Sequence, residues 1–177
     1  MTGPGGLFVV VSGPPGSGKT TLARALAGAL GLPLVAKDTV KEALMSVLPV
    51  PDVQASRQLG RASLAVMLAL AAEAPRGAVI ESTFHRSLAV TDLGVLPGAV
   101  VEVFCRCDRD VALARYRERA GTRHLGHFDA VRRPDDLWNP EGSEPVAGGW
   151  PVIEADTNKP VDVAALARLV LDRRAAS

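Results

Sequence analysis

Hydrophobic residues gather in short runs that alternate with longer segments of helical spacing. Residues 7–12 are a β-branched run with hardly a polar position, which is typical of a strand buried on both faces. Four more short runs are expected to form strands, at residues 32–36, 78–81, 100–105 and 151–155. Apolar positions at helical spacing predict helices at residues 19–30, 39–48, 53–74, 111–120 and 162–174.

This alternation of strands and helices predicts an α/β fold with a five-stranded parallel sheet between two layers of helices. Ligands in such folds bind beyond the carboxyl ends of the strands. The length predicts a single domain over residues 1–177. Within it, the segment 121–149 is rich in Gly, Pro and charge and is too long for a simple connection, so we expect a lid at about 115–149.

Composition limits the function further. Hydrophobic residues make up 47% of the 177 residues, which excludes a disordered chain. The net charge of +1 argues against an architectural nucleic-acid binder and against a membrane-surface protein. No apolar run approaches the roughly 20 residues that span a bilayer. Residues 1–6 lack the basic region of a signal peptide, and the two cysteines form no disulfide framework, so we expect a cytoplasmic protein.

One motif carries most of the functional argument. It matches the pattern G-x-x-x-x-G-K-[ST] and consists of Gly13, Pro14, Pro15, Gly16, Ser17, Gly18, Lys19 and Thr20. It follows a predicted strand and precedes a predicted helix, as a P-loop requires. Backbone N–H groups of such a loop cradle phosphates, Lys19 reaches the β- and γ-phosphates, and the Thr20 hydroxyl binds Mg²⁺. We therefore expect residues 13–20, with Thr21 beyond them, to bind ATP and Mg²⁺.

Two other classes of P-loop protein fit less well. A GTPase needs a guanine-reading Asn-Lys-x-Asp, and residues 158–162 place the Asp one position late. The chain is also too short for the core and helical subdomain of an oligomeric motor ATPase.

Two carboxylates are predicted at the same edge of the sheet as the phosphate loop. Asp38 follows the predicted second strand, where it could accept the proton of an attacking hydroxyl or simply cap a helix. Glu81 ends the third strand, where it could hold Mg²⁺ through water, contact the acceptor or do neither. Ser82, Thr83 and His85 follow and could line the acceptor pocket.

Asp38, the phosphate loop and the Asp156-Thr157 pair together resemble the small P-loop kinases. The similarity is greatest to chloramphenicol 3-O-phosphotransferase and related AAA-type kinase domains, and zeta toxins are more distant. It covers most of the chain and implies a nucleoside-monophosphate-kinase-like fold. It also implies that Asp38 is the catalytic base and that Asp156 and Thr157 belong to the adenine-side loop. Lys37 departs from the apolar neighbourhood of that Asp in the chloramphenicol enzyme.

Arginines concentrate before and within the predicted lid. Residues 106–133 contain eight Arg and four acids, although the chain as a whole is close to neutral. Arg115, Arg119 and Arg123 are spaced four apart, which places them along one helix face. In the family resembled, arginines here contact adenine and the transferring phosphate, and the alternative is a solvated helix face with ion pairs. His124 and His127 are more consistent with lid or substrate contacts than with a zinc site.

The sequence thus predicts an ATP-dependent kinase whose acceptor is a hydroxyl of a small molecule, with Asp38 as general base. Two alternatives stay open. One is a nucleotide-binding switch with slow hydrolysis, and the other is a kinase of polynucleotide ends, which the near-neutral charge disfavours. Neither the acceptor nor the oligomeric state follows from the sequence.

Overall fold

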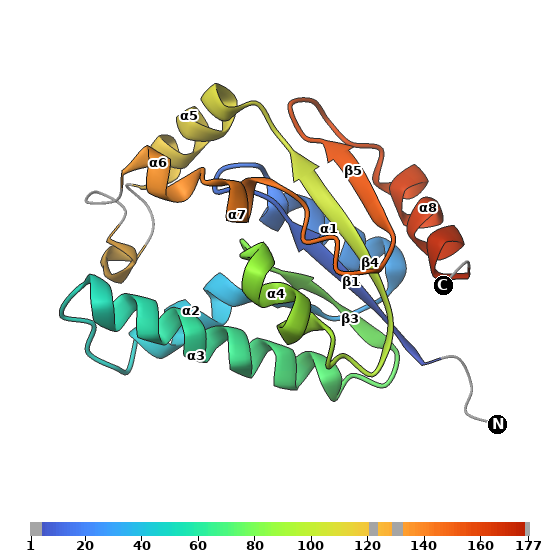
Figure 1. The fold of residues 1–177 in the computed structure, drawn as a ribbon, viewed down its shortest axis with the longest axis horizontal. Helices are drawn as coiled ribbons and strands as arrows, with labels where there is room; N and C mark the ends of the chain where they lie inside the picture. The colour runs from blue at the N-terminus through green and yellow to red at the C-terminus, as the bar shows by residue number, and fades with distance from the viewer. Residues whose placement is uncertain (1–4, 121–123, 129–132, 176–177) are drawn as a thin grey trace.

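The computed structural model describes residues 5–120, 124–128 and 133–175, and within them five strands form one parallel sheet (Figure 1). The strands are β1 (Gly6–Ser12), β2 (Leu34–Ala36), β3 (Gly77–Glu81), β4 (Gly98–Arg106) and β5 (Val152–Asp156). The longer helices are α1 (Lys19–Leu30), α2 (Lys37–Met45), α3 (Val53–Ala72), α4 (Arg86–Leu93), α5 (Arg109–Ala120) and α8 (Val163–Ala175). Among the described residues between α5 and β5 there are three short helices, namely η1 (Leu125–His127), α6 (Pro134–Leu137) and α7 (Pro140–Ser143).

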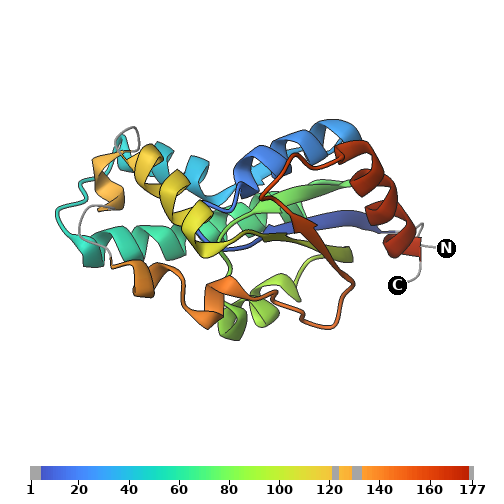
Figure 2. The same cartoon turned by 90° about the horizontal axis from the view of Figure 1, so that it is seen from above.

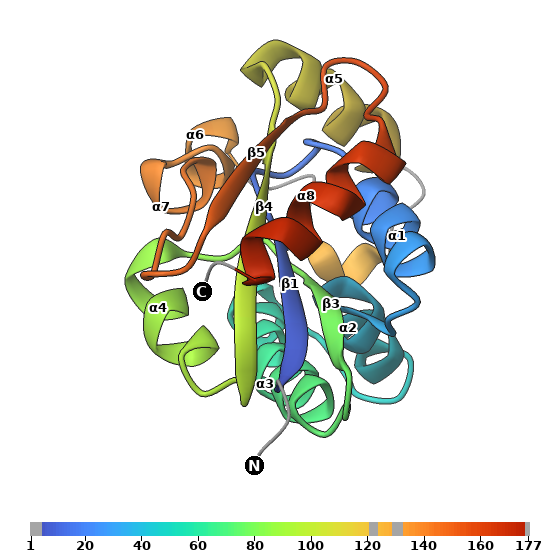
Figure 3. The same ribbon diagram turned by 90° about the vertical axis from the view of Figure 1, so that its right-hand side faces the viewer.

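The strand order is β2-β3-β1-β4-β5, so the first strand is central. Alternate residues of β1 serve opposite layers because side chains alternate across a strand. Val9 and Val11 pack with α1 and α8, whereas Phe8 and Val10 pack with α3 and α4. Helices therefore cover both faces, as Figures 2 and 3 show from two directions. This confirms the predicted three-layer α/β/α architecture.

The observed elements follow the predicted ones closely, with shifts that have local causes. β2 begins at Leu34 because Pro33 has no N–H and the Leu32 N–H bonds to the Ala27 carbonyl at the end of α1. α2 spans Lys37–Met45, two residues earlier than predicted at its start. The sequence pattern missed α4, since only Ala89 and Leu93 of its eight residues are buried.

A buried carboxylate anchors the segment that follows α7. Glu102 of β4 is fully buried. It accepts hydrogen bonds from Ser12 Oγ at 2.5 Å, Val146 N at 2.9 Å, Ala147 N at 2.9 Å and Trp150 Nε1 at 3.2 Å. Because these donors satisfy the carboxylate, Glu102 ties the end of β1 to residues 146–150.

The same end of the sheet collects the segments expected to form the site. β1 and β3 end at Ser12 and Glu81, and α5 and α6 lie beyond this end of the sheet (Figure 1). η1 lies against α2, where His127 bonds Glu42. In the part of the chain that the structure describes, no helix is both long and apolar enough to cross a membrane.

Candidate active site

The phosphate loop, residues 13–18, joins β1 to α1 and depends on glycine. Gly16 has φ +78°, and a Cβ there would lie 2.0 Å from the Ala112 carbonyl oxygen of α5, so no side chain fits. Gly18 caps α1 with φ +83° and makes no side-chain cap, which leaves the first N–H groups of α1 uncovered by a capping side chain. This geometry suits a loop that wraps around phosphate oxygens.

Lys19 lies over this loop and is almost fully buried. Its Nζ donates a hydrogen bond of 2.8 Å to the Pro14 carbonyl. Burial lowers the pKa of Lys19, and the Glu81 carboxylate is the largest of the neighbours that oppose this shift. The ammonium group is therefore held at the position where a nucleotide's phosphates would compensate its desolvation.

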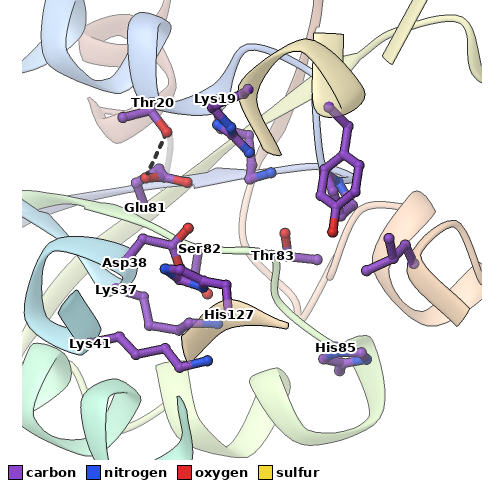
Figure 4. Close-up of a pocket in the computed structure, with 14 residues that line it drawn as sticks. Lys19, Thr20, Lys37, Asp38, Lys41, Glu81, Ser82, Thr83, His85 and His127 are labelled. Atoms are coloured by element: carbon purple, nitrogen blue, oxygen red, sulfur yellow. Dashed lines mark hydrogen bonds between the residues drawn. The ribbon is translucent and has the colours of Figure 1, made fainter. Parts of the chain in front are cut away.

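Thr20 and Glu81 face each other across the sheet edge. Thr20 Oγ1 donates to Glu81 Oε2 at 3.2 Å (Figure 4). Burial raises the pKa of Glu81, and the nearby Lys19 ammonium acts in the opposite direction. A hydroxyl and a carboxylate are hard oxygen donors, so the pair fits a Mg²⁺ ion that keeps most of its ligands as water and phosphate. No group of three or more His, Cys, Asp or Glu side chains that could hold a metal occurs among the described residues.

A cavity opens beside this pair and contains Asp38. It is lined by Pro15, Lys19, Thr20, Lys37, Asp38, Lys41, Glu81, Ser82, Thr83, His85, Tyr116, Arg119, His127 and Leu137. In Figure 4, Asp38 stands between Glu81 and the ammonium ends of Lys37 and Lys41. The structure thus brings Asp38, Lys19, Thr20 and Glu81 into one cavity, as the sequence predicted.

Asp38 does not cap a helix. The N-cap of α2 is Ala36, which makes no side-chain cap bond, and Asp38 lies in the first turn. The capping interpretation left open above is therefore wrong. Asp38 and the loop residue Pro15 line the same cavity, so the Asp38 carboxylate lies beside the loop that would hold the γ-phosphate.

The two described arginines of the predicted α5 face are placed differently. Arg119 lines the Asp38 cavity. Arg115 Nη1 donates to the Thr157 carbonyl at 3.0 Å and lies 4.0 Å from where a Cβ on Gly18 would be. Arg115 is thus beside the start of α1 and Arg119 is at the cavity. Arg123 lies outside the described residues.

The loop that follows β5 lies against Arg115. Thr157 is buried, and its N and Oγ1 both bond to the Arg106 carbonyl at 2.9 Å. Hydrogen bonds from the Asn158 backbone N–H and side-chain amide, together with Lys159, lower the pKa of Asp156. The side chain of Asp156 therefore holds the loop together, whereas Thr157 contacts Arg115 through its backbone carbonyl.

Several cavity residues were missing from the sequence-based set. Lys41 is buried, and its Nζ donates to Ser56 Oγ at 2.8 Å. His127, for which the sequence suggested lid or substrate contacts, is buried at the cavity and bonds Glu42 Oε1 at 2.9 Å. Tyr116 enters from α5 and packs edge to face on Trp138. For Lys41, its position one helical turn after Lys37 was the available signal.

Six further described residues line the same cavity. They are Lys37, Lys41, Ser82, Thr83, His85 and His127. Partial desolvation lowers the pKa of His85, and the Lys37 ammonium lowers it further. His85 is therefore neutral at neutral pH and can both donate and accept hydrogen bonds.

Comparison with known proteins agrees with the observed fold. No curated protein matches the chain. Among solved structures, a candidate kinase from Chloroflexus aurantiacus is 29% identical, with a TM-score of 0.84 over 95% of this chain and 98% of the other. A gluconokinase from Sinorhizobium meliloti is 24% identical, with a TM-score of 0.61 over 98% and 93%. A shikimate kinase from Acinetobacter baumannii, in complex with shikimate, is 20% identical, with a TM-score of 0.60 over 96% and 92%. The AAA domain family model matches residues 8–135, and the chain belongs to that family.

Proposed function

We propose that this protein transfers the γ-phosphoryl group of ATP to a hydroxyl of a small molecule. The observation that carries the proposal is that Asp38 shares one cavity with Lys19, Thr20 and Glu81. A phosphate loop with no adjacent base would fit a binding switch equally well. A carboxylate at the cavity supplies the group that a kinase needs in addition.

In the proposed reaction, Asp38 accepts the proton of the acceptor hydroxyl as that oxygen attacks the γ-phosphorus. The new O–P bond forms as the bond from the γ-phosphorus to the bridging β-phosphate oxygen breaks, and ADP leaves. Lys19 and Arg119 compensate the charge on the phosphoryl oxygens. Thr20 and Glu81 would hold Mg²⁺, which neutralises phosphate charge when bound. Positioning supplies most of the remaining rate enhancement.

We assign the binding of the nucleotide to the phosphate loop and to the side of α5 that carries Arg115. Residues 13–18, with Lys19, Thr20 and Thr21, would hold the phosphates. Arg115, Asp156 and Thr157 would form the adenine side, a role supported by the Arg115 bond to the Thr157 carbonyl. The segment 115–149 would act as the lid, since Tyr116, Arg119, His127 and Leu137 all line the cavity from that segment.

The relatives support the class of reaction. The listed structures of similar fold include a gluconokinase, a shikimate kinase and an APS kinase, which are all small-molecule kinases by name. Chloramphenicol remains one hypothetical acceptor, suggested by the resemblance of the sequence to chloramphenicol 3-O-phosphotransferase.

The test is ADP release from ATP and Mg²⁺ across a panel of hydroxylated compounds, with Lys19→Ala as the blank. Acceptor-stimulated release that is lost in Lys19→Ala is the expected result. ATP binding with slow hydrolysis that no acceptor stimulates, and that Asp38→Asn leaves unchanged, would instead identify a nucleotide switch.

A further inference from the structure

Two side chains of the Asp38 cavity come from the segment between β3 and α4. Thr83 and His85 both line the cavity (Figure 4), whereas Phe84 between them is buried in the core. His85 is exposed, so core packing does not fix the place of its side chain. It is the N-cap of α4, the residue directly before the first turn. The position of His85 in the cavity therefore depends on how the start of α4 is held.

The start of α4 is capped by a residue from another helix. His85 makes no side-chain cap hydrogen bond, and the first turn of α4 contains no acidic residue. Instead, Glu141 Oε2 of α7 accepts a hydrogen bond of 2.8 Å from the backbone N–H of Ser87. Ser87 is the second residue of α4, and its N–H is one that an N-cap side chain ordinarily satisfies. The Glu141 carboxylate also lies at the positive end of the helix dipole, which favours a negative charge.

α7 contacts the segment between β3 and α4 at a second point. A Cβ on Gly142 would lie 3.1 Å from Thr83 Cγ2, so the backbone of α7 packs against Thr83. α7 is itself capped, because Asn139 Oδ1 accepts a hydrogen bond of 3.2 Å from the Gly142 N–H. α7 therefore supports both cavity residues of this segment, Thr83 through Gly142 and His85 through the cap that Glu141 provides.

The charges near Glu141 agree with this placement. Hydrogen bonds from the side chain and the backbone N–H of Ser87 lower the pKa of Glu141, and the neighbouring His85 and Arg86 act in the same direction. Burial and the Lys37 ammonium lower the pKa of His85, and the Glu141 carboxylate opposes them. The carboxylate of α7 and the imidazole at the cavity therefore interact directly through their charges.

We propose, on the basis of the phosphotransferase function above, that Glu141 is a positioning residue for the acceptor. By capping α4 from α7, it holds His85 where the imidazole hydrogen-bonds a hydroxyl of the acceptor. A neutral imidazole suits this task, since it has one donor and one acceptor nitrogen. Glu141 belongs to the segment 115–149, so the proposed lid acts on the acceptor through this contact as well as through the residues that line the cavity.

The first test compares KM for the acceptor with KM for ATP in Glu141→Ala. The acceptor used is whichever of gluconate, shikimate and chloramphenicol most stimulates ADP release by the wild-type protein. We expect KM for this acceptor to rise about three- to tenfold, the size of one neutral hydrogen bond, and KM for ATP to stay within about twofold. Glu141→Gln should keep most of the affinity, because its amide oxygen still accepts the Ser87 N–H.

The matched control is Glu144→Ala. Glu144 forms an exposed ion pair of 3.6 Å with Arg86 of the same helix, so its loss removes a carboxylate beside α4 and leaves the cap in place. Glu144→Ala should change neither KM. An equal rise in acceptor KM for Glu144→Ala and Glu141→Ala, or an equal change in the KM of ATP and of acceptor, would overturn the assignment.

A double-mutant cycle tests whether Glu141 acts through His85. His85→Ala alone should raise KM for the acceptor, and Glu141→Ala should add less than about twofold to it, because the group that it positions is already gone. Full multiplication of the two separate effects in the double variant would show that Glu141 does not act through His85.

NMR provides a measurement that does not depend on activity. In Glu141→Ala, the Ser87 amide hydrogen should exchange about tenfold faster, the result of losing about one hydrogen bond. The His85 ring should titrate at lower pH, because the carboxylate that raises its pKa is absent. Glu144→Ala should leave the Ser87 exchange rate unchanged.

These arms separate two failures. If Glu141→Ala changes neither the Ser87 exchange nor the His85 titration, the positioning role is wrong and the phosphotransferase function stands. If both change, but no acceptor stimulates ADP release and Asp38→Asn leaves the basal hydrolysis unchanged, the phosphotransferase function fails and the role toward the acceptor falls with it.

Discussion

The hydroxyl of Thr20 lies 3.2 Å from Glu81 Oε2, although 61 residues separate the two in the chain. The contact arises because α1 begins after the short phosphate loop that follows β1, and β3 is the parallel neighbour of β1, with Val11 in register with Glu81. Glu81→Gln keeps the shape of the side chain and removes its charge. We expect the Mg²⁺ concentration for half-maximal activity to rise about tenfold or more, because the ion loses an anionic partner.

This experiment has an internal pH check. Burial raises the pKa of Glu81 above 4.5, so its carboxylate takes up a proton at pH values where an ordinary Glu is still ionised. The wild-type Mg²⁺ requirement should therefore increase as the pH falls, and the requirement of Glu81→Gln should change less. Glu73→Gln, at the exposed end of α3, serves as the control. A Mg²⁺ requirement of Glu81→Gln equal to that of wild type would rule out the metal assignment.

Replacement of Asp38 by Asn should separate chemistry from nucleotide binding. Because the amide cannot accept the hydroxyl proton, kcat should fall by about 10²–10⁴-fold. KM for ATP should stay within about twofold, since the role proposed for Asp38 is toward the acceptor hydroxyl and not toward the nucleotide. Steady-state kinetics of ADP release measures both, with Asp172→Asn on the exposed face of α8 as the control. Near-normal turnover in Asp38→Asn would exclude the general-base role.

The two arginines of α5 should give different kinetic defects. Arg115→Gln is expected to raise KM for ATP, because Arg115 contacts the Thr157 carbonyl beside the phosphate loop. Arg119→Gln is expected to lower kcat about tenfold or more, because Arg119 lines the cavity where phosphoryl charge would develop in the proposed reaction. Arg117→Gln, on the same helix and exposed, provides a matched control for the loss of charge. Identical kinetic changes in Arg115→Gln and Arg119→Gln would contradict this division.

Glu102→Ala should destabilise the protein without changing a residue that lines the cavity. The change leaves the Val146 and Ala147 N–H groups and Trp150 Nε1 without their acceptor. We expect a loss of about 2–3 kcal/mol in the free energy of unfolding, which corresponds to a Tm lower by about 5–10 °C. The control is Glu154→Ala on the neighbouring β5, whose ion pair with Arg106 is exposed and contributes less than about 1 kcal/mol. If thermal unfolding shows equal decreases in Tm for Glu102→Ala and Glu154→Ala, Glu102 does not anchor residues 146–150.

The two cysteines should differ in reactivity. Cys105 is fully buried, and burial raises the pKa of its thiol to about 12, so it should not react in the folded protein. Cys107 is half-buried and lies 3.6 Å from Arg115 Nη1. A thiol reagent at pH 8 should therefore modify one residue rapidly, and Cys107→Ser should abolish that phase. ATP should slow the reaction at Cys107, and an unchanged rate would argue against nucleotide binding beside Arg115.

The sequence by itself determined the fold and the phosphate loop. Both depend on local signals, since the β-branched run of residues 7–12 is buried on both faces in any parallel sheet, and Gly16 and Gly18 provide backbone conformations that L-residues avoid. The position of Asp38 near the phosphate loop could also be predicted, because both follow strands of one parallel sheet and the carboxyl ends of parallel strands lie at the same edge.

Only the tertiary structure decided how the side chains divide between tasks. Arg115 and Arg119 have the same spacing and residue type, yet packing of α5 against the loop after β5 sends one to Thr157 and leaves the other at the cavity. The buried positions of Lys41 and Glu102 depend on Ser56 and on residues 146–150, which are distant in sequence. Such long-range contacts leave no periodic pattern in the chain, so the full lining of the Asp38 cavity became visible only once α2, β3 and η1 were brought together.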